Sequence, residues 1–562
     1  MRRASGWIAL FVVACSQAPD PSSDAGVGPV GPPPWVGIAG DRAPPRPPQS
    51  VVGSNHYLKA QSFAQCHSAG TGVLRDTKGR DVAPLSQWRG TMMAHAARDP
   101  FYLATFSQEL AHRPGATRAV ESLCARCHAP GAVFDLEADG DHLSFATLTS
   151  GTGKVPELAR DGVNCSLCHQ IQPDGLGSFA SFDGAFVIKD ERRIFGPHAN
   201  PQIGPMQTFV SYTPTEAPHP LQSSLCATCH TVITKALDPN GKPVGPDFVE
   251  QGAYLEWRAS DFRTEGTPGP KAASCQSCHI PTSDEDGAPI SSVLALYPTS
   301  GLGARSPIGR HVFVGGNSQM LRVIGDERDW VGTIAPQAAL DAQVARTEKN
   351  LQAGAGVTIT SAGKTQAVVR VENRTGHKFP TGYPSRRAWL HVKVTAFGQV
   401  KFESGRWDTY GRIVDANGTP IDGRDQVRLH RDVVRTSSEA QIYELVPGDS
   451  KNRPARSLLD ASVVLKDDRL LPRGFYPPAG ALVAPVGTAD DANFGATDDV
   501  TFVYGDGSSG GRVDVELCFQ SVRPSELENL AGEPTPMSRR FLDMIAKRVA
   551  PVVIATATAP IP

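Results

Sequence analysis

Residues 124–128 read Cys-Ala-Arg-Cys-His, and the same pattern occurs three more times along the chain. The four copies are Cys124-Ala-Arg-Cys127-His128, Cys165-Ser-Leu-Cys168-His169, Cys226-Ala-Thr-Cys229-His230 and Cys275-Gln-Ser-Cys278-His279. Two thiols at this spacing reach the two vinyl groups of one haem, and the next histidine then lies beneath the iron as its proximal ligand. The pattern therefore predicts four covalently attached c-type haems.

Pairs of cysteines at this spacing also occur in other kinds of site. Zinc knuckles, redox-active dithiols and structural disulfides all use Cys-x-x-Cys. None of these sites requires a histidine directly after every second cysteine. Haem attachment is the interpretation that accounts for every residue of the pattern.

A fifth, incomplete copy precedes the other four. Residues 63–67 read Phe-Ala-Gln-Cys-His, so Phe63 stands where the first cysteine would be. Cys66 could attach a haem by a single thioether, the site could hold a haem without that bond, or it could hold none. The histidines of the five copies are 61, 41, 61 and 49 residues apart. Because His67 continues this series, we predict a fifth haem beside it.

An electron-transfer haem is usually six-coordinate, with a second histidine on the far side of the iron. Ten histidines lie outside the five copies, and four of them are predicted as distal ligands: His95, His198, His311 and His377. His95 lies in residues 88–98, which we expect to be helical, and the other three lie beside turn-forming Gly or Pro. Surface or hydrogen-bonding roles are favoured for the remaining six: His56, His112, His142, His219, His391 and His430.

The N-terminus has the pattern of an export signal. Arg2 and Arg3 precede an apolar stretch, residues 7–14, that is too short to span a bilayer. The next residue, Cys15, follows Val-Val-Ala as in a bacterial lipobox, where the cysteine is lipidated and becomes the new N-terminus. We predict a lipoprotein signal peptide over residues 1–15; the alternative is an ordinary signal peptide that is cut elsewhere.

Residues 16–50 are predicted to be a tether. Ten prolines lie between residues 19 and 48, and this composition favours an extended linker rather than a core. The folded part is therefore expected to begin near Val51. The expected location is outside the cytoplasm, on the outer membrane or facing the periplasm or cell surface, with the lipid on Cys15 as the membrane contact.

The folded part is predicted to be a multidomain α+β structure. Residues 51–355 form a loop-rich, mainly α-helical haem domain that ends in a helix over 336–351, with Leu340, Val344 and Leu351 on one face. Residues 356–562 are predicted to be an all-β, Ig-like sandwich. Its expected strands include 357–360, 367–371, 390–394, 442–445 and 513–519.

The composition agrees with a loop-rich protein that uses haem in its core. The 55 glycines and 47 prolines make up about 18% of the 562 residues, against about 12% in an average chain. The net charge of −2 gives no electrostatic reason to expect a nucleic-acid partner. Cys518 stands alone in a strand-like run, which favours a free thiol over a disulfide to Cys66.

Four further stretches support a resemblance to a known family. They are Trp88 to Pro100 with Met-Met-Ala-His-Ala-Ala-Arg-Asp-Pro at its end, Gly162-Val-Asn-Cys165, Tyr254-Leu-Glu-Trp257 and Thr375-Gly-His-Lys-Phe-Pro-Thr-Gly382. Over about residues 55–525 the chain resembles exported multihaem c-type cytochromes related to the tetrahaem cytochrome c-554 and hydroxylamine oxidoreductase of ammonia oxidisers. The resemblance implies closely packed haems, mostly with two histidine ligands, that pass electrons. Phe63 departs from the family pattern.

The predicted function is electron transfer between redox protein partners by four or five haems. The alternative is an oxidoreductase that acts on a small nitrogen or sulfur oxyanion at one five-coordinate haem, with the His67 site as the natural candidate. Haem storage or a purely structural role is disfavoured. The sequence identifies no catalytic residue and no oligomeric state.

Overall fold

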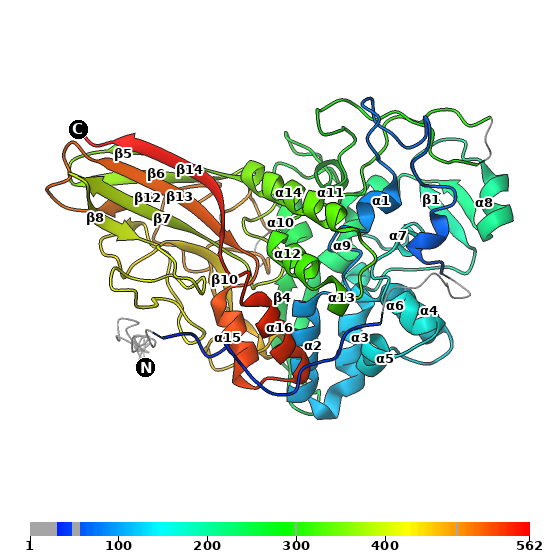
Figure 1. Ribbon diagram of the computed structural model, residues 1–562, viewed down its shortest axis with the longest axis horizontal. Coiled ribbons are helices and arrows are strands. Elements are labelled where there is room, and N and C mark those ends of the chain that lie inside the picture. The colour runs from blue at the N-terminus through cyan, green and yellow to red at the C-terminus, as the bar shows by residue number, and fades with distance from the viewer. Residues whose placement is uncertain (1–30, 48–56, 298–300, 479–480) are drawn as a thin grey trace, which may run out of the picture.

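The computed structural model describes residues 31–47, 57–297, 301–478 and 481–562. The predicted signal peptide, with Cys15, lies outside these residues, and so does His56. A mainly helical part and a β-sheet part lie side by side in Figure 1. Within the described residues, no helix has the length and apolar character needed to cross a membrane.

The helical part consists of short helices joined by long loops, as the Gly and Pro content predicts. Its helices are α1 Pro84–Trp88, α2 Pro100–His112, α3 Thr117–His128, α4 Pro130–Ala138, α5 Phe145–Ser150, α6 Lys154–Ala159, α7 Cys165–Cys168, α8 Ile203–Val210, α9 Ser223–His230, α10 Ala253–Arg258, α11 Cys275–His279, α12 Ser318–Asp326, α13 Arg328–Val331 and α14 Gln337–Gly354. Two small sheets lie among them: β1 Arg193–Gly196 with β2 Thr213–Glu216, and β3 Val232–Leu237 with β4 Pro243–Gln251.

Two predicted helix boundaries are confirmed. Asp99 caps α2 by accepting a hydrogen bond from the backbone N–H of Phe101, and Pro100 is the first helical residue. The helix predicted over 336–351 is α14, which buries Leu340, Val344 and Leu351 on one face.

The β-sheet part contains two sheets. One has six strands, in the order β11-β10-β7-β13-β14 with β8 paired to β7; the other has four, in the order β5-β6-β12-β9. The strands are β5 Ala355–Ala362, β6 Gln366–Asn373, β7 Arg387–Ala396, β8 Gln399–Ser404, β9 Val433–Val434, β10 Ile442–Gly448, β11 Val463–Asp467, β12 Thr497–Val503, β13 Arg512–Gln520 and β14 Val552–Pro560. All five strand segments predicted from the sequence lie within these strands.

Both sheets bury side chains in one shared hydrophobic core. Val369 and Val500 of the four-stranded sheet and Val392 and Val515 of the six-stranded sheet are among its fully buried residues. All strand pairs in the two sheets are antiparallel except β9 with β12, which are parallel. Cys518 is a free, fully buried thiol in β13.

The prediction that residues 356–562 are all β is wrong for one segment. Helices α15 Pro524–Gly532 and α16 Pro536–Ile545 interrupt the sheet part and pack against α2 of the helical part. The rings of Phe541 and Phe101 lie 5.4 Å apart at this contact. The amphipathic α16 buries its apolar face there, so the two parts share a core and the boundary at residue 355 is not a clean break.

The described part of the predicted tether is also not free. Residues 31–47 run along the surface beneath α15, α16 and α2 (Figure 1). Trp35 is 1% exposed and lies edge-on to Tyr410, with ring centroids 6.4 Å apart. The backbone N–H of Arg46 donates to Trp330 O at 2.7 Å. We call residues 31–47 the N-terminal strap; Pro33 and Trp35 are both buried in it.

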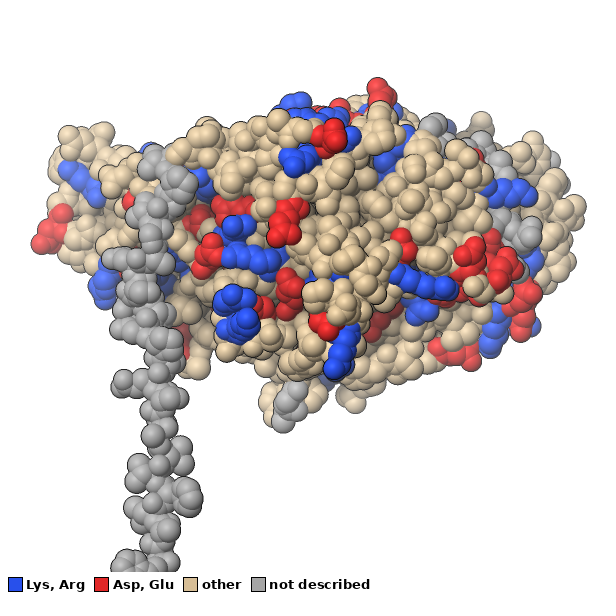
Figure 2. Space-filling view, turned by 90° about the horizontal axis from the view of Figure 1, so that it is seen from below, with Lys and Arg blue, Asp and Glu red and all other residues tan. Residues whose placement is uncertain are grey.

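The charged side chains on the face seen in Figure 2 are of both signs and interspersed. This distribution agrees with the low net charge of the chain.

Candidate functional site

Each complete Cys-x-x-Cys-His copy lies on a helical turn. His128, His230 and His279 are the last residues of α3, α9 and α11, and His169 directly follows α7. Residues three apart on a helix lie on the same side of it, so each pair of cysteines faces one direction. Side-chain caps start two of the short helices: Asn164 accepts from Leu167 N–H, and Ser274 accepts from Ser277 N–H.

The incomplete fifth copy forms the same kind of turn. The N–H groups of Cys66 and His67 both donate to Phe63 O, at 3.1 and 2.8 Å. Phe63 itself is 7% exposed and stacks on Tyr212, with ring centroids 6.2 Å apart. The backbone therefore presents Cys66 and His67 as the other copies do, while the residue that replaces the first cysteine packs into the protein.

Four of the five motif histidines donate from Nδ1 to a backbone carbonyl, at 2.5–2.9 Å. The pairs are His67 with Leu294, His128 with Ala96, His169 with Phe195 and His279 with Val314. A metal-binding histidine usually donates its other ring N–H in this way, which fixes the tautomer and the ring orientation. The bond leaves Nε2 as the atom that can bind a metal.

Two motif histidines each lie close to a predicted distal histidine. The ring centroids of His169 and His311 are 6.2 Å apart, and those of His279 and His377 are 6.3 Å apart with planes only 16° from parallel. His311 and His377 also donate from Nδ1 to backbone carbonyls, those of Gly309 and Lys378. None of these four Nε2 atoms makes a hydrogen bond within the described residues.

This separation fits a metal ion between the rings. A metal–imidazole bond is about 2.0 Å long, and the ring centre lies about 1.2 Å beyond the bound nitrogen in standard imidazole geometry. Two imidazoles on opposite sides of one ion therefore have centres about 6.3 Å apart. His169 with His311 and His279 with His377 match that value, so these residues fit axial ligation of an iron.

The cysteines of different copies lie close together. The Cys127 thiol is within hydrogen-bonding contact of Cys229, and the Cys226 thiol is within hydrogen-bonding contact of Cys275. Burial raises the pKa of Cys165 and of Cys168 to about 12. The ten described cysteines are all free of disulfides.

His95 is not on a helix, and it does not face another histidine among the described residues. The helix expected over 88–98 is not formed. Helix α1 ends at Trp88, and turns follow it. The Thr91 hydroxyl donates to Trp88 O and accepts from Ala94 N–H, which competes with helical bonding. His95 Nδ1 bonds to Thr91 O and Nε2 bonds to Thr333 Oγ1, both at 2.7 Å, so both ring nitrogens have protein partners.

His198 is half-buried and lies near Arg305. Burial is the larger cause of its lowered pKa, and the charge of Arg305 adds to it. Within the described residues its ring faces no motif histidine. The structure therefore brings two of the four predicted distal ligands, His311 and His377, to motif histidines.

Two motif histidines have neighbours that the sequence analysis missed. The His128 ring stacks on Tyr102 at 3.6 Å between ring centroids, and the buried Tyr102 hydroxyl has no hydrogen-bond partner among the described residues. His230 lies near the Arg386 guanidinium, whose pKa burial lowers to about 10. Tyr102 lies four residues after the sequence stretch around His95, but its contact with His128 depends on tertiary packing and has no local signal.

No protein-family model matches the chain. No curated protein matches it. Among solved structures, the chain is similar to a penta-haem cytochrome c552 from Thermochromatium tepidum, with 18% sequence identity and a TM-score of 0.46. The alignment covers 90% of this chain and 99% of that chain.

Proposed function

We propose that this protein is a multihaem c-type cytochrome that transfers electrons between redox proteins. The observation that carries the proposal is the spacing of two pairs of imidazoles, His169 with His311 and His279 with His377, whose ring centroids are 6.2 and 6.3 Å apart. Haem iron, when bound, supplies one-electron redox chemistry. The chain supplies the attachment thiols, the axial imidazoles and the low-dielectric surroundings that tune the potential.

The contacts between the motif sites give a connected order for the proposed haems. His67 lies near His169. Burial is the main cause of the lowered pKa of His67, and the nearby His169 lowers it further. Cys168 is near Cys229, Cys127 contacts Cys229, and Cys226 contacts Cys275. The site of His230 is therefore the junction that touches the sites of His169, His128 and His279, and the His67 site is at one end.

This junction gives a direct test of electron relay. A Cys226→Ala/Cys229→Ala double variant removes the attachment at the junction, whereas Cys275→Ala/Cys278→Ala removes it at a terminal branch. We expect the junction variant to split the single reoxidation phase of the reduced protein into separate slow phases in stopped-flow spectroscopy. The terminal variant, as the matched control, loses amplitude but keeps one phase. Equal kinetics in both variants would overturn the proposed order.

A second candidate function has one specific observation in its favour. His230 has a buried guanidinium, Arg386, nearby and no facing histidine among the described residues. A cation next to an open iron position would attract a small nitrogen or sulfur oxyanion. The relay predicts only low-spin signals in the electron paramagnetic resonance spectrum of the oxidised protein. A high-spin signal that shifts with nitrite, hydroxylamine or sulfite, and no longer shifts in Arg386→Gln, would favour the oxidoreductase.

We also propose that the protein is an exported lipoprotein anchored through Cys15. The support is the sequence of residues 1–15. Replacing Cys15 with Ala should release the haem-containing protein from the membrane fraction, as measured by haem staining of fractions. Unchanged membrane association would contradict the anchor.

A further inference from the structure

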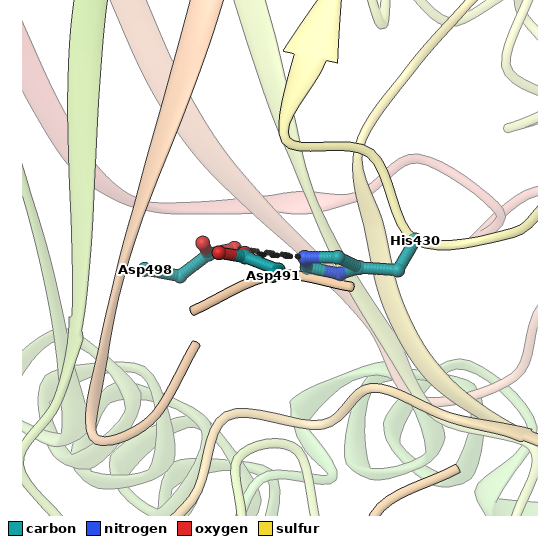
Figure 3. Close-up of side chains that lie close together, drawn as sticks. All are labelled: His430, Asp491 and Asp498. Carbon is teal, nitrogen blue, oxygen red and sulfur yellow. Dashed lines mark hydrogen bonds and ion pairs between the residues drawn. The ribbon is translucent and has the colours of Figure 1, made fainter. Parts of the chain in front are cut away.

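His430, Asp491 and Asp498 form a compact cluster in the β-sheet part, separate from the proposed haem sites. One side-chain ligand atom from each lies within 4.8 Å of the other two. His430 precedes β9, Asp491 lies in the loop before β12, and Asp498 lies in β12. Figure 3 shows the imidazole and both carboxylates pointing toward one another.

The imidazole is held between carboxylates on both sides. His430 Nε2 is 2.9 Å from Asp491 Oδ2 and 3.9 Å from Asp498 Oδ2. On the other side, His430 Nδ1 is 3.2 Å from Asp468 Oδ2, which also accepts a hydrogen bond from Gln441 Nε2 at 3.1 Å. A carboxylate on the second nitrogen is the usual partner of a metal-binding histidine.

Each aspartate also accepts a hydrogen bond from a group other than His430. Asp491 Oδ1 accepts from Asn493 N–H at 2.9 Å, and Asp498 Oδ2 accepts from the Tyr443 hydroxyl at 2.7 Å. Asp498 is 0% exposed, and its Oδ1 accepts no hydrogen bond from the residues that the structure describes. A buried carboxylate oxygen without a partner is costly, so this atom indicates a missing ligand.

The nearby cations do not neutralise this side of the cluster. Lys466 is 3.3 Å from Asp468 and 3.6 Å from Glu444, and Arg523 bonds to Glu444. These contacts lie beyond Asp468, on the Nδ1 side of His430.

We propose that His430 Nε2, Asp491 Oδ2 and Asp498 Oδ1 bind one divalent cation of the zinc type. One imidazole and two carboxylates are a donor set that Zn²⁺ accepts. Asp468 would then orient the imidazole, and Tyr443 and Asn493 would orient the two carboxylates.

Such an ion would lie where the two sheets meet. Asp498 belongs to the four-stranded sheet, and Tyr443, whose hydroxyl donates to Asp498, lies in β10 between β11 and β7 of the six-stranded sheet. A ligand that binds only the folded state raises the melting temperature in proportion to the logarithm of its concentration. The role we assign to the ion is to stabilise this junction.

The competing account is a proton shared between Asp491 and Asp498. The Asp498→Asn variant distinguishes the metal site from the shared proton, because an amide keeps the shape of the protonated acid but removes a metal ligand. His391→Gln is the matched control: His391 lies in β7 of the six-stranded sheet between Glu403 and Glu516, at 3.1 and 2.9 Å, without the buried orphan oxygen.

The experiment uses the untagged, haem-matured protein after dialysis against a chelator. Zinc chloride is titrated calorimetrically, and bound zinc is measured against haem iron. We expect one zinc per chain in the wild type and in His391→Gln, and at least tenfold weaker binding in Asp498→Asn and Asp491→Asn. Zinc-edge X-ray absorption should show one imidazole ligand.

Two results would overturn the proposal. One is no saturable binding to the wild type; the other is wild-type zinc affinity in Asp498→Asn, which would place the ion elsewhere. A zinc-independent rise in the melting temperature of Asp498→Asn, together with absent binding, would establish the shared proton instead. The Soret and far-ultraviolet circular dichroism spectra verify that each variant is folded, and the isosteric Asp498→Asn remains informative if Asp491→Asn does not fold.

Discussion

The imidazole of His377 faces that of His279 with ring centroids 6.3 Å apart and planes 16° from parallel. His279 ends a helix of the helical part, and His377 lies between β6 and β7 of the sheet part. The two parts of the chain therefore meet at one candidate iron site. The sheet part therefore brings a candidate ligand, His377, to a motif histidine of the helical part.

Removing His377 should leave the iron at His279 without its sixth ligand, the second of the two that the protein would supply. His377→Ala should convert one low-spin haem to high spin without changing the number of covalent haems, as seen by electron paramagnetic resonance and by mass. His391→Ala is the control, because His391 bonds only to Glu403 and Glu516. An unchanged low-spin spectrum in His377→Ala would contradict the pairing.

His95 should behave differently from His377. Both of its ring nitrogens are hydrogen-bonded, to Thr91 and Thr333. We expect His95→Ala to keep every low-spin signal while lowering the free energy of unfolding by about 2 kcal/mol, since two buried hydrogen bonds are lost. Appearance of a high-spin haem in this variant would show that His95 is a ligand after all.

The N-terminal strap should contribute to stability. Trp35 is 1% exposed, and truncating a large buried aromatic side chain costs about 3 kcal/mol. Trp35→Ala should therefore lower the free energy of unfolding by about that amount in chemical denaturation. Phe397→Ala, at an 80% exposed position, is the control and should change it little. Equal stability of both variants would mean that the strap is only loosely attached.

Stability should fall in acid partly through Glu444. Burial would raise the pKa of Glu444, but the charges of Lys466, Arg523 and Arg387 outweigh it and lower the pKa. A carboxyl group with a lowered folded pKa stabilises the fold above its unfolded pKa, about 4.3, and this contribution is lost as pH falls through the folded pKa.

The matching variant is Glu444→Gln. At pH 7 it should lose about 3 kcal/mol of unfolding free energy, because buried cations lose their partner. The difference in unfolding free energy between this variant and the wild type should become smaller as the pH falls below about 4. The exposed pair of Glu372 with Arg374 supplies the control, since Glu372→Gln should change stability by less than about 0.5 kcal/mol. A gap that does not depend on pH would exclude the assigned role of Glu444.

The sequence predicted the elements whose pattern is local. Five strands, the helix α14 and the Asp99 cap of α2 follow from side-chain alternation, helical spacing and a Pro at the first helical position. The helices α15 and α16 had a comparable signal that was not used, since Thr535 caps α16 and Pro536 begins it. The stretch around His95 was predicted incorrectly because Thr91 bonds to nearby backbone in place of a helix.

The candidate site was predictable only where its residues form a motif. The nine motif cysteines and five motif histidines are fixed by spacing, and His311 and His377 were found beside turns. The carbonyls that orient the motif histidines, such as Phe195 O and Val314 O, carry no sequence signal because every residue has one. Tyr102 and Asp498 gain their roles only from residues far away in the chain.

The measurement that tests the central claim most directly is the denatured intact mass of the protein matured by a cytochrome c assembly system. The account predicts five haem masses in the wild type and four in Cys66→Ala, because the turn at Phe63 presents Cys66 and His67 as the other copies present theirs. Four haem masses in both proteins would remove Cys66 as an attachment point. Fewer than four in the wild type would contradict the proposal that this protein is a multihaem cytochrome built on the four Cys-x-x-Cys-His copies.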